Sequence, residues 1–166
     1  MIHNSAEEVL NKYTDMVYRL AYARTKNKYD ADDIFQDVFL KYVKSAPEFT
    51  NEEHQKAWLI RVTINCSKSL FNSSWFKKRV SMEDKDVQDI EVTEDNIDEG
   101  NDVYTAVMQL PLKYRTAIHL YYYEDYSIIE ISSILSSKES TVKSWLRRGR
   151  NMLEEILKEV DFDYEI

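Results

Sequence analysis

The sequence contains little of what several common fold classes require. It has two Gly, two Pro and one Cys in 166 residues. So few turn-forming residues do not suit a β-sandwich or barrel, whereas Leu, Ile, Lys and Glu recur in helical patterns. The single cysteine, Cys66, cannot form a disulfide within the chain and is expected to be a small buried residue rather than a reactive thiol. We therefore expect an all-α protein.

Signals for export and for membrane insertion are also lacking. No apolar run reaches the roughly 18 residues that a membrane-spanning helix needs. No early stretch combines a basic start with an apolar run, as a signal peptide does. The three histidines are scattered and have no neighbouring Cys, so the sequence predicts no metal site. A cytoplasmic protein without membrane insertion is expected.

The N-terminal half shows three amphipathic stretches. Apolar spacing predicts helices at about residues 6–25, 31–44 and 52–71, the last with a short continuation toward residue 79. Residues 5–8 form a capping box for the first helix, and Asp30 is expected to cap the second. These helices would form one small helical domain.

An acidic stretch follows. From Ser81 to Asp102 there are ten Asp or Glu residues and one Lys, a net charge of −9. Because the whole chain has a net charge of −8, the remainder sums to +1. Sparse apolar residues and self-repelling charge predict a flexible linker. The expected division is therefore a domain at residues 1–80, a linker at 81–103 and a second domain at 104–166.

The second domain has the pattern of a helix-turn-helix. Pro111 suits the first turn of one helix, and Ser127 begins a capping box for a short helix that ends near Leu135. A longer helix starts three or four residues later, and residues 139–153 of it carry four Lys or Arg residues. A short helix, a turn and a basic helix form the usual plan of a DNA-binding helix-turn-helix.

The two faces of the basic helix follow from its turn of about 100° per residue. The core-facing residues are Val142, Leu146, Gly149 and Leu153. The opposite face has Ser140, Ser144, Arg147 and Asn151, with Lys143 and Arg148 on its flanks. Small hydroxyls allow close approach to base edges, and Arg and Lys bind phosphate or guanine. A solvated basic face is the alternative, but the preceding helix and turn favour DNA binding.

Three segments, from both predicted domains, resemble one family. The segment LPLKYRTAIHLYYYEDYSIIEISSILSSKESTVKSWLRRGRNML resembles region four of extracytoplasmic-function (ECF) RNA polymerase sigma factors, which binds promoter DNA. The segments DADDIFQDVFLKYVKS and AWLIRVTINCSKSLF resemble their region two. The resemblance implies core RNA polymerase and promoter DNA as partners, an anti-sigma factor as a further candidate partner, and no cofactor. It also implies two helical domains joined by a flexible linker.

The resemblance assigns candidate site residues. The upstream promoter element would be contacted by Ser140, Thr141, Lys143, Ser144, Trp145, Arg147 and Arg148. The melted element would be contacted by Arg61, Asn65, Lys68, Lys77, Lys78 and Arg79, with the loop 47–53 walling part of a flipped-base pocket. Core polymerase would be bound by Asp33, Gln36, Asp37 and Leu40, which share one face of their helix.

Asn65 and several residues outside these candidate sets have simpler interpretations than a contact with polymerase or DNA. For Asp30 and Asp32 we favour a solvated face or a cap. Asn65 is also compatible with an ordinary surface amide, Trp75 is equally compatible with packing, and residues 121–123, three tyrosines, are expected to pack rather than to stack on bases.

The chain departs from the family pattern in the turn and in the basic helix. Ser136 replaces a common Gly. Lys138 replaces a common capping residue, for which Ser137 is an alternative. Trp145 stands where Arg is common and Gly149 where Ala is common, and Gly weakens a helix by about 1 kcal/mol relative to Ala.

The predicted function is that of a sigma factor, which catalyses nothing itself. One alternative is a stand-alone helix-turn-helix regulator, but such a protein has no use for a polymerase-docking face. Another is an enzyme acting on nucleic acid, which would need a metal or nucleophile arrangement that the sequence does not contain.

Overall fold

The computed structural model describes residues 4–82 and 102–164, which contain helices and no β-strand. The all-α prediction is therefore confirmed. The chain divides into two compact units, residues 1–91 and 92–166. Most of the acidic segment predicted as a linker, residues 83–101, lies outside the described residues. In the two described ranges, we find no helix with the length and apolarity needed to cross a membrane.

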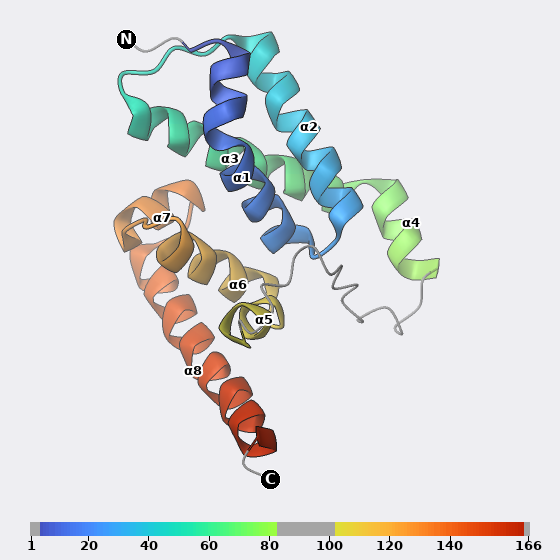
Figure 1. The fold of residues 1–166 in the computed structure, drawn as a ribbon, viewed down its shortest axis with the longest axis vertical. Helices are drawn as coiled ribbons and strands as arrows, with labels where there is room; N and C mark the ends of the chain where they lie inside the picture. Colours follow the sequence, from blue (N-terminus) through green and yellow to red (C-terminus); the bar gives the residue numbers. More distant parts are fainter. Residues whose placement is uncertain (1–3, 83–101, 165–166) are drawn as a thin grey trace. The chain divides into compact units, whose positions relative to one another are not determined.

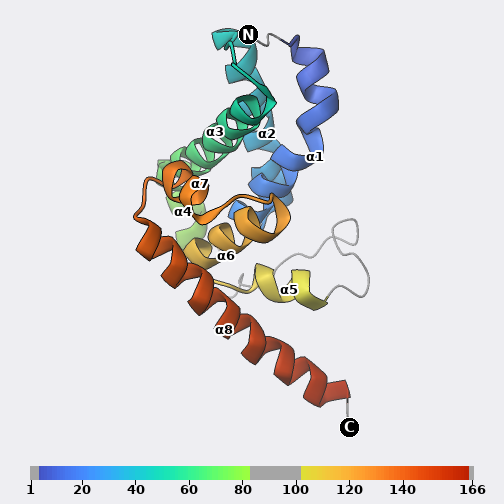
Figure 2. The same cartoon turned by 90° about the vertical axis from the view of Figure 1, so that its left-hand side faces the viewer.

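The first unit is built on three packed helices, α1 (Ala6–Thr25), α2 (Lys28–Ser45) and α3 (Glu52–Asn72). In Figures 1 and 2, α1 and α2 lie side by side and α3 packs against both. Their buried apolar side chains form one core, which includes Val9, Val17, Leu20, Ile34, Val38, Leu59, Ile60 and Ile64. Cys66 is also buried, as predicted, and burial raises the pKa of its thiol.

The predicted cap of α2 is wrong. The helix begins three residues earlier, at Lys28, and the Asn27 side chain accepts a hydrogen bond from the Asp30 backbone N–H at 3.0 Å. Asp30 lies in the first turn and is only 1% exposed, so it is not on a solvated face either. Its carboxylate is bound instead by Arg79, from the separate short helix α4 (Ser74–Met82).

The second unit contains α5 (Asp102–Met108), α6 (Leu112–Ile118), a π-helical turn η2 (His119–Tyr123), α7 (Ile128–Ile134) and α8 (Glu139–Tyr164). Figure 2 shows α8 as the long helix against which α6 packs. The predicted capping box is confirmed: the Ser127 hydroxyl accepts from the Glu130 N–H, and the Glu130 carboxylate accepts from the Ser127 N–H.

Sequence patterns missed α5 and η2. Ala106, Val107 and Met108 of α5 are buried, and α5 packs against α8. A seven-residue helix gives only a short periodic pattern, and α5, unlike α6 and α7, is preceded by neither a proline nor a Ser–Glu capping box. In η2, His119 is 1% exposed and its Nε2 lies 3.3 Å from the carboxylate of the buried Glu124. A π-helical turn has no distinctive sequence pattern.

Gly149 has a packing role that helix propensity alone does not predict. It is buried where α8 passes α6, and a Cβ atom there would lie 3.0 Å from Ile118 Cγ1 and 3.3 Å from its Cδ1. The gain of about 1 kcal/mol that Ala would bring to the helix is therefore opposed by a displacement of Ile118. Gly at this position permits the close approach of the two helices.

Ser136, in the turn before α8, has a φ of 50°. This left-handed conformation favours glycine, because a side chain there crowds the backbone. We expect Ser136→Gly to stabilise the second unit by about 0.5–1 kcal/mol. The matched control is Ser132→Gly within α7, which should destabilise that unit by a similar amount. Amide hydrogen exchange in α8 would measure both changes, and a destabilising Ser136→Gly would contradict the prediction.

Candidate nucleic-acid and protein interfaces

The N-terminal part of α8 has the two faces predicted from its sequence. Val142 and Leu146 are 0% and 1% exposed and Gly149 is buried, whereas Leu153 is half-buried. Of the seven candidate contacts to the upstream element, Ser140, Lys143, Arg147 and Arg148 are exposed, and Thr141, Ser144 and Trp145 are half-buried. The Lys138 carbonyl accepts from the Val142 N–H, so Lys138 occupies the cap position, while the Ser137 hydroxyl donates to the Leu135 carbonyl.

Residues of α6 and η2 flank this basic face. A hydrogen bond from Arg148 lowers the pKa of the Tyr114 hydroxyl, and Lys113, whose ammonium lies 5.1 Å from the Tyr114 ring centre, acts in the same direction. On the other flank, Arg150 donates to the Tyr122 hydroxyl at 3.3 Å. A cation held by a phenol is already partly oriented before it binds a phosphate.

Each of the three consecutive tyrosines packs on a neighbouring ring, Tyr121 and Tyr122 on each other with ring centres 4.9 Å apart, but the three differ in exposure. Tyr123 is half-buried and stacks on His119, with ring centres 5.4 Å apart. Tyr121 and Tyr122, by contrast, are 36% and 50% exposed. The π-helical turn decides which rings point outward, so the sequence alone could not separate them.

The outer face of α3 carries the candidate contacts to the melted element. Arg61, Asn65 and Lys68 are all exposed. The loop 47–53 is anchored by Phe49, which is 1% exposed and packs on Tyr42, His54 and Trp58. The loop leads into the beginning of α3. About 12 residues of helix, or about 18 Å, therefore separate the end of the loop at residue 53 from Asn65. The contribution of this loop to a flipped-base pocket near Asn65 stays a prediction.

Helix α4 presents the remaining candidates. Lys77 and Lys78 are exposed, and Trp75 is 58% exposed. Arg79 is different: its guanidinium donates to both carboxylate oxygens of Asp30, and its side chain is only 21% exposed. This ion pair holds Arg79 against the beginning of α2, and its contact with the melted element stays a prediction.

The outer face of α2 combines carboxylates with apolar side chains. Asp33, Gln36 and Asp37 are exposed, and Leu40 is 53% exposed. Sequence reasoning missed two apolar residues on the same stripe, which are Tyr29 at 73% and Val43 at 58% exposure. Their spacing from Leu40, of 11 and 3 residues, could have identified them. An exposed apolar stripe beside acidic residues is typical of a protein-binding surface.

Comparison with known families identifies both units. Residues 9–76 match the model of Sigma-70 region 2, and residues 100–153 match that of Sigma-70, region 4. The chain is 28% identical to the ECF RNA polymerase sigma factor SigW of Bacillus subtilis, over 92% of this chain and 89% of that protein. It is 30% identical to the ECF sigma factor SigE of Mycolicibacterium smegmatis, over 92% of this chain and 62% of that protein.

Solved structures agree at the level of the fold. The sigma factor RpoE from Bartonella quintana, determined in complex with the anti-sigma factor NepR, superposes with a TM-score of 0.67 and 23% identity. The match covers 92% of this chain and 96% of that one. Because both sigma-70 regions match and ECF sigma factors align over most of the chain, the chain belongs to the ECF type of RNA polymerase sigma factors.

Proposed function

We propose that the chain binds core RNA polymerase, recognises two promoter elements and initiates transcription of a specific gene set. The observation that carries this proposal is the presence of both sigma regions in one chain. A stand-alone helix-turn-helix regulator is not favoured, since it would leave region two without a role. Polymerisation belongs to the core enzyme, so we assign no catalytic residue to this chain and place its action in the cytoplasm.

In this proposal, core polymerase docks on the outer face of α2. The exposed apolar side chains of Tyr29, Leu40 and Val43 supply the area that association buries. Asp33 and Asp37 supply charges for basic residues of the polymerase, and Gln36 supplies hydrogen bonds. Charged groups around an apolar centre mainly fix the orientation of a complex and raise its rate of formation.

The upstream element is assigned to the exposed face of α8. Arg147 and Ser144 face outward for base edges, with Lys143 and Arg148 on the flanks for phosphates. The melted element is assigned to Arg61, Asn65 and Lys68 of α3 together with Lys77 and Lys78 of α4. An amide between cations can hydrogen-bond an unstacked base while the cations hold the strand.

An anti-sigma factor is a further proposed partner. RpoE from Bartonella quintana, which shares this fold, was determined in complex with the anti-sigma factor NepR. CnrH, which also shares it, was determined with the cytosolic domain of CnrY. We extend this class of partner to the present chain. We also propose that residues 1–80 and 104–166 act as separate domains joined by the acidic segment 81–103.

Core binding provides the direct test of the proposed docking face. We expect Gln36→Ala with Asp37→Ala to weaken the affinity for core polymerase about tenfold, because central interface residues dominate binding energy. The matched control is Glu7→Ala with Asn11→Ala, which removes one acid and one amide from an exposed face of α1. Competition binding and run-off transcription would measure both, and equal loss in the two pairs would remove the assignment.

A further inference from the structure

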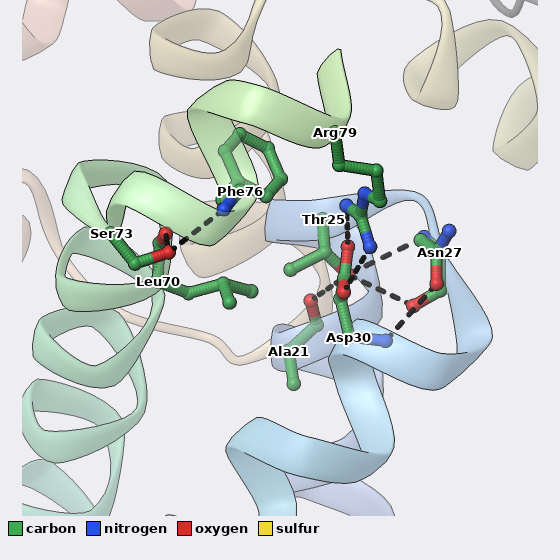
Figure 3. Close-up of polar contacts among 8 residues, drawn as sticks. All are labelled: Ala21, Thr25, Asn27, Asp30, Leu70, Ser73, Phe76 and Arg79. Carbon is green, nitrogen blue, oxygen red and sulfur yellow. Dashed lines mark hydrogen bonds and ion pairs between the residues drawn. The ribbon is translucent and has the colours of Figure 1, made fainter. Parts of the chain in front are cut away.

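The least expected contact in the first unit joins the beginning of α2 to the end of α4. Arg79 Nη1 donates to Asp30 Oδ1 at 2.9 Å, and Nη2 donates to Oδ2 at 2.7 Å. Figure 3 shows the guanidinium lying over the carboxylate in this two-bond arrangement. The two residues are 49 positions apart in the sequence. The contact therefore fixes one helix to another and does not belong to local helix capping.

Arg79 also organises the aromatic residues of α4. Its guanidinium carbon lies 4.7 Å from the ring centre of Trp75 and 5.0 Å from that of Phe76. Phe76 in turn packs against Phe71 of α3, with ring centres 5.2 Å apart. A guanidinium that binds a carboxylate through its edge can still contact aromatic rings through its faces. The orientation of Trp75 is thus linked to Asp30 through Arg79.

The rest of α4 is held weakly. Residues 74–81, the part of α4 whose side chains the structure describes, include no buried side chain. At its beginning, the Ser73 hydroxyl donates to the Leu70 carbonyl and accepts from the Phe76 N–H, which fixes the turn from α3 (Figure 3). A helix with few buried contacts opens locally at low cost. The Asp30–Arg79 pair holds the other end of α4, away from this turn.

We propose that Asp30 is a positioning residue for the binding of single-stranded promoter DNA. Through Arg79 it holds α4 so that Trp75 and Lys78, three residues apart on one side of the helix, present an aromatic ring and a cation to the separated strand, a combination suited to stacking and phosphate contact. This inference rests on the proposed function. Asp30 itself is 1% exposed, so it reaches neither the polymerase nor the DNA, and its effect passes through α4.

The choice of a buried carboxylate supports a role in orientation. Removing a carboxylate from water is unfavourable, and apolar residues of similar volume often hold two helices equally well. A two-bond Arg–carboxylate pair adds a fixed direction, because both N–H groups must meet both oxygens. Such a pair suits a helix whose surface has to be aimed at a ligand.

The test uses the full chain assembled with core polymerase on a promoter. Asp30→Asn should reduce permanganate reactivity of the melted region about tenfold or more, because hydrogen bonds to a charged partner are lost. Affinity for core polymerase and for the upstream duplex should stay within about twofold of wild type. The matched control is Asp32→Asn, the same change two residues along α2, which should open the promoter normally.

A second variant keeps the proposal testable should Asp30→Asn fail to fold. Arg79→Lys keeps the positive charge but loses the two-bond geometry, and it should also impair opening while preserving core binding. Normal opening by either variant, even with a lower melting temperature, would overturn the positioning role. Parallel loss of core binding would also overturn it, because the pair would then support the whole unit. Failure of the wild-type protein to bind core polymerase would instead refute the proposed function.

Discussion

Replacing both Arg147 and Arg148 with Ala should weaken binding to the upstream promoter element about a hundredfold or more. Each side chain is exposed on the outward part of α8, and a good contact to a base or a charged phosphate contributes roughly 1–3 kcal/mol. Lost phosphate contacts should also reduce the slope of log affinity against log salt by about one unit each. Titration of duplex DNA at several salt concentrations would measure both quantities.

The single variants separate the two roles. A residue that binds guanine should relax the sequence preference at one position when it is changed to Ala, whereas a phosphate contact should weaken all sequences alike. The control is Lys158→Ala, which removes a cation from the distal part of the same helix, where its ammonium lies 3.1 Å from Glu154. If the double variant bound as tightly as this control, α8 would be only a solvated basic helix.

Leu146→Ala should destabilise the second unit by about 2–5 kcal/mol, the usual range for deletion of a fully buried Leu side chain. Leu146 is 1% exposed on the core face of α8, between Val142 and Gly149. For a unit of this size such a loss is a large part of the whole stability. Amide hydrogen exchange in α6 and α8 would measure the change separately from the first unit.

The neighbouring residue provides the control for this change. Arg147→Ala alters the next position of the same helix but should change stability by no more than about 0.5 kcal/mol, because its side chain is exposed. Leu146→Ala should therefore lower the stability of the second unit, whereas Arg147→Ala should weaken DNA binding. A change below about 1 kcal/mol for Leu146→Ala would mean that α8 does not depend on its core face.

The features that the sequence predicted correctly depend on residues close together in the chain. The hydroxyls of Ser5 and Ser127 each accept from an N–H three residues ahead, and these contacts form whenever the helix does. The core face of α8 follows from the spacing of Val142, Leu146 and Gly149, because every helix has nearly the same turn per residue. The outward position of Arg147 follows from the same geometry.

The exposed face of α2 could be predicted only in part. Asp33, Gln36 and Asp37 were placed correctly because the opposite stripe is apolar. Tyr29 was missed because it lies before the predicted start of the helix at residue 31, and Val43 because the family resemblance assigned only residues from Asp33 to Leu40 to this face. Which residues of a single helix face outward can be predicted from the periodic pattern of apolar residues, once the ends of the helix are known.

By itself, the sequence determined the helical class, the faces of the long helices and the two sigma regions, because these depend on spacing along the chain. Only the tertiary structure decided the partner of Asp30, because its ion pair with Arg79 joins residues 49 positions apart in the sequence. It also decided that Gly149 meets Ile118 and that Tyr122 is exposed while Tyr123 is half-buried. The physical reason is that burial and ion pairing depend on which helices meet, and no local pattern contains that information.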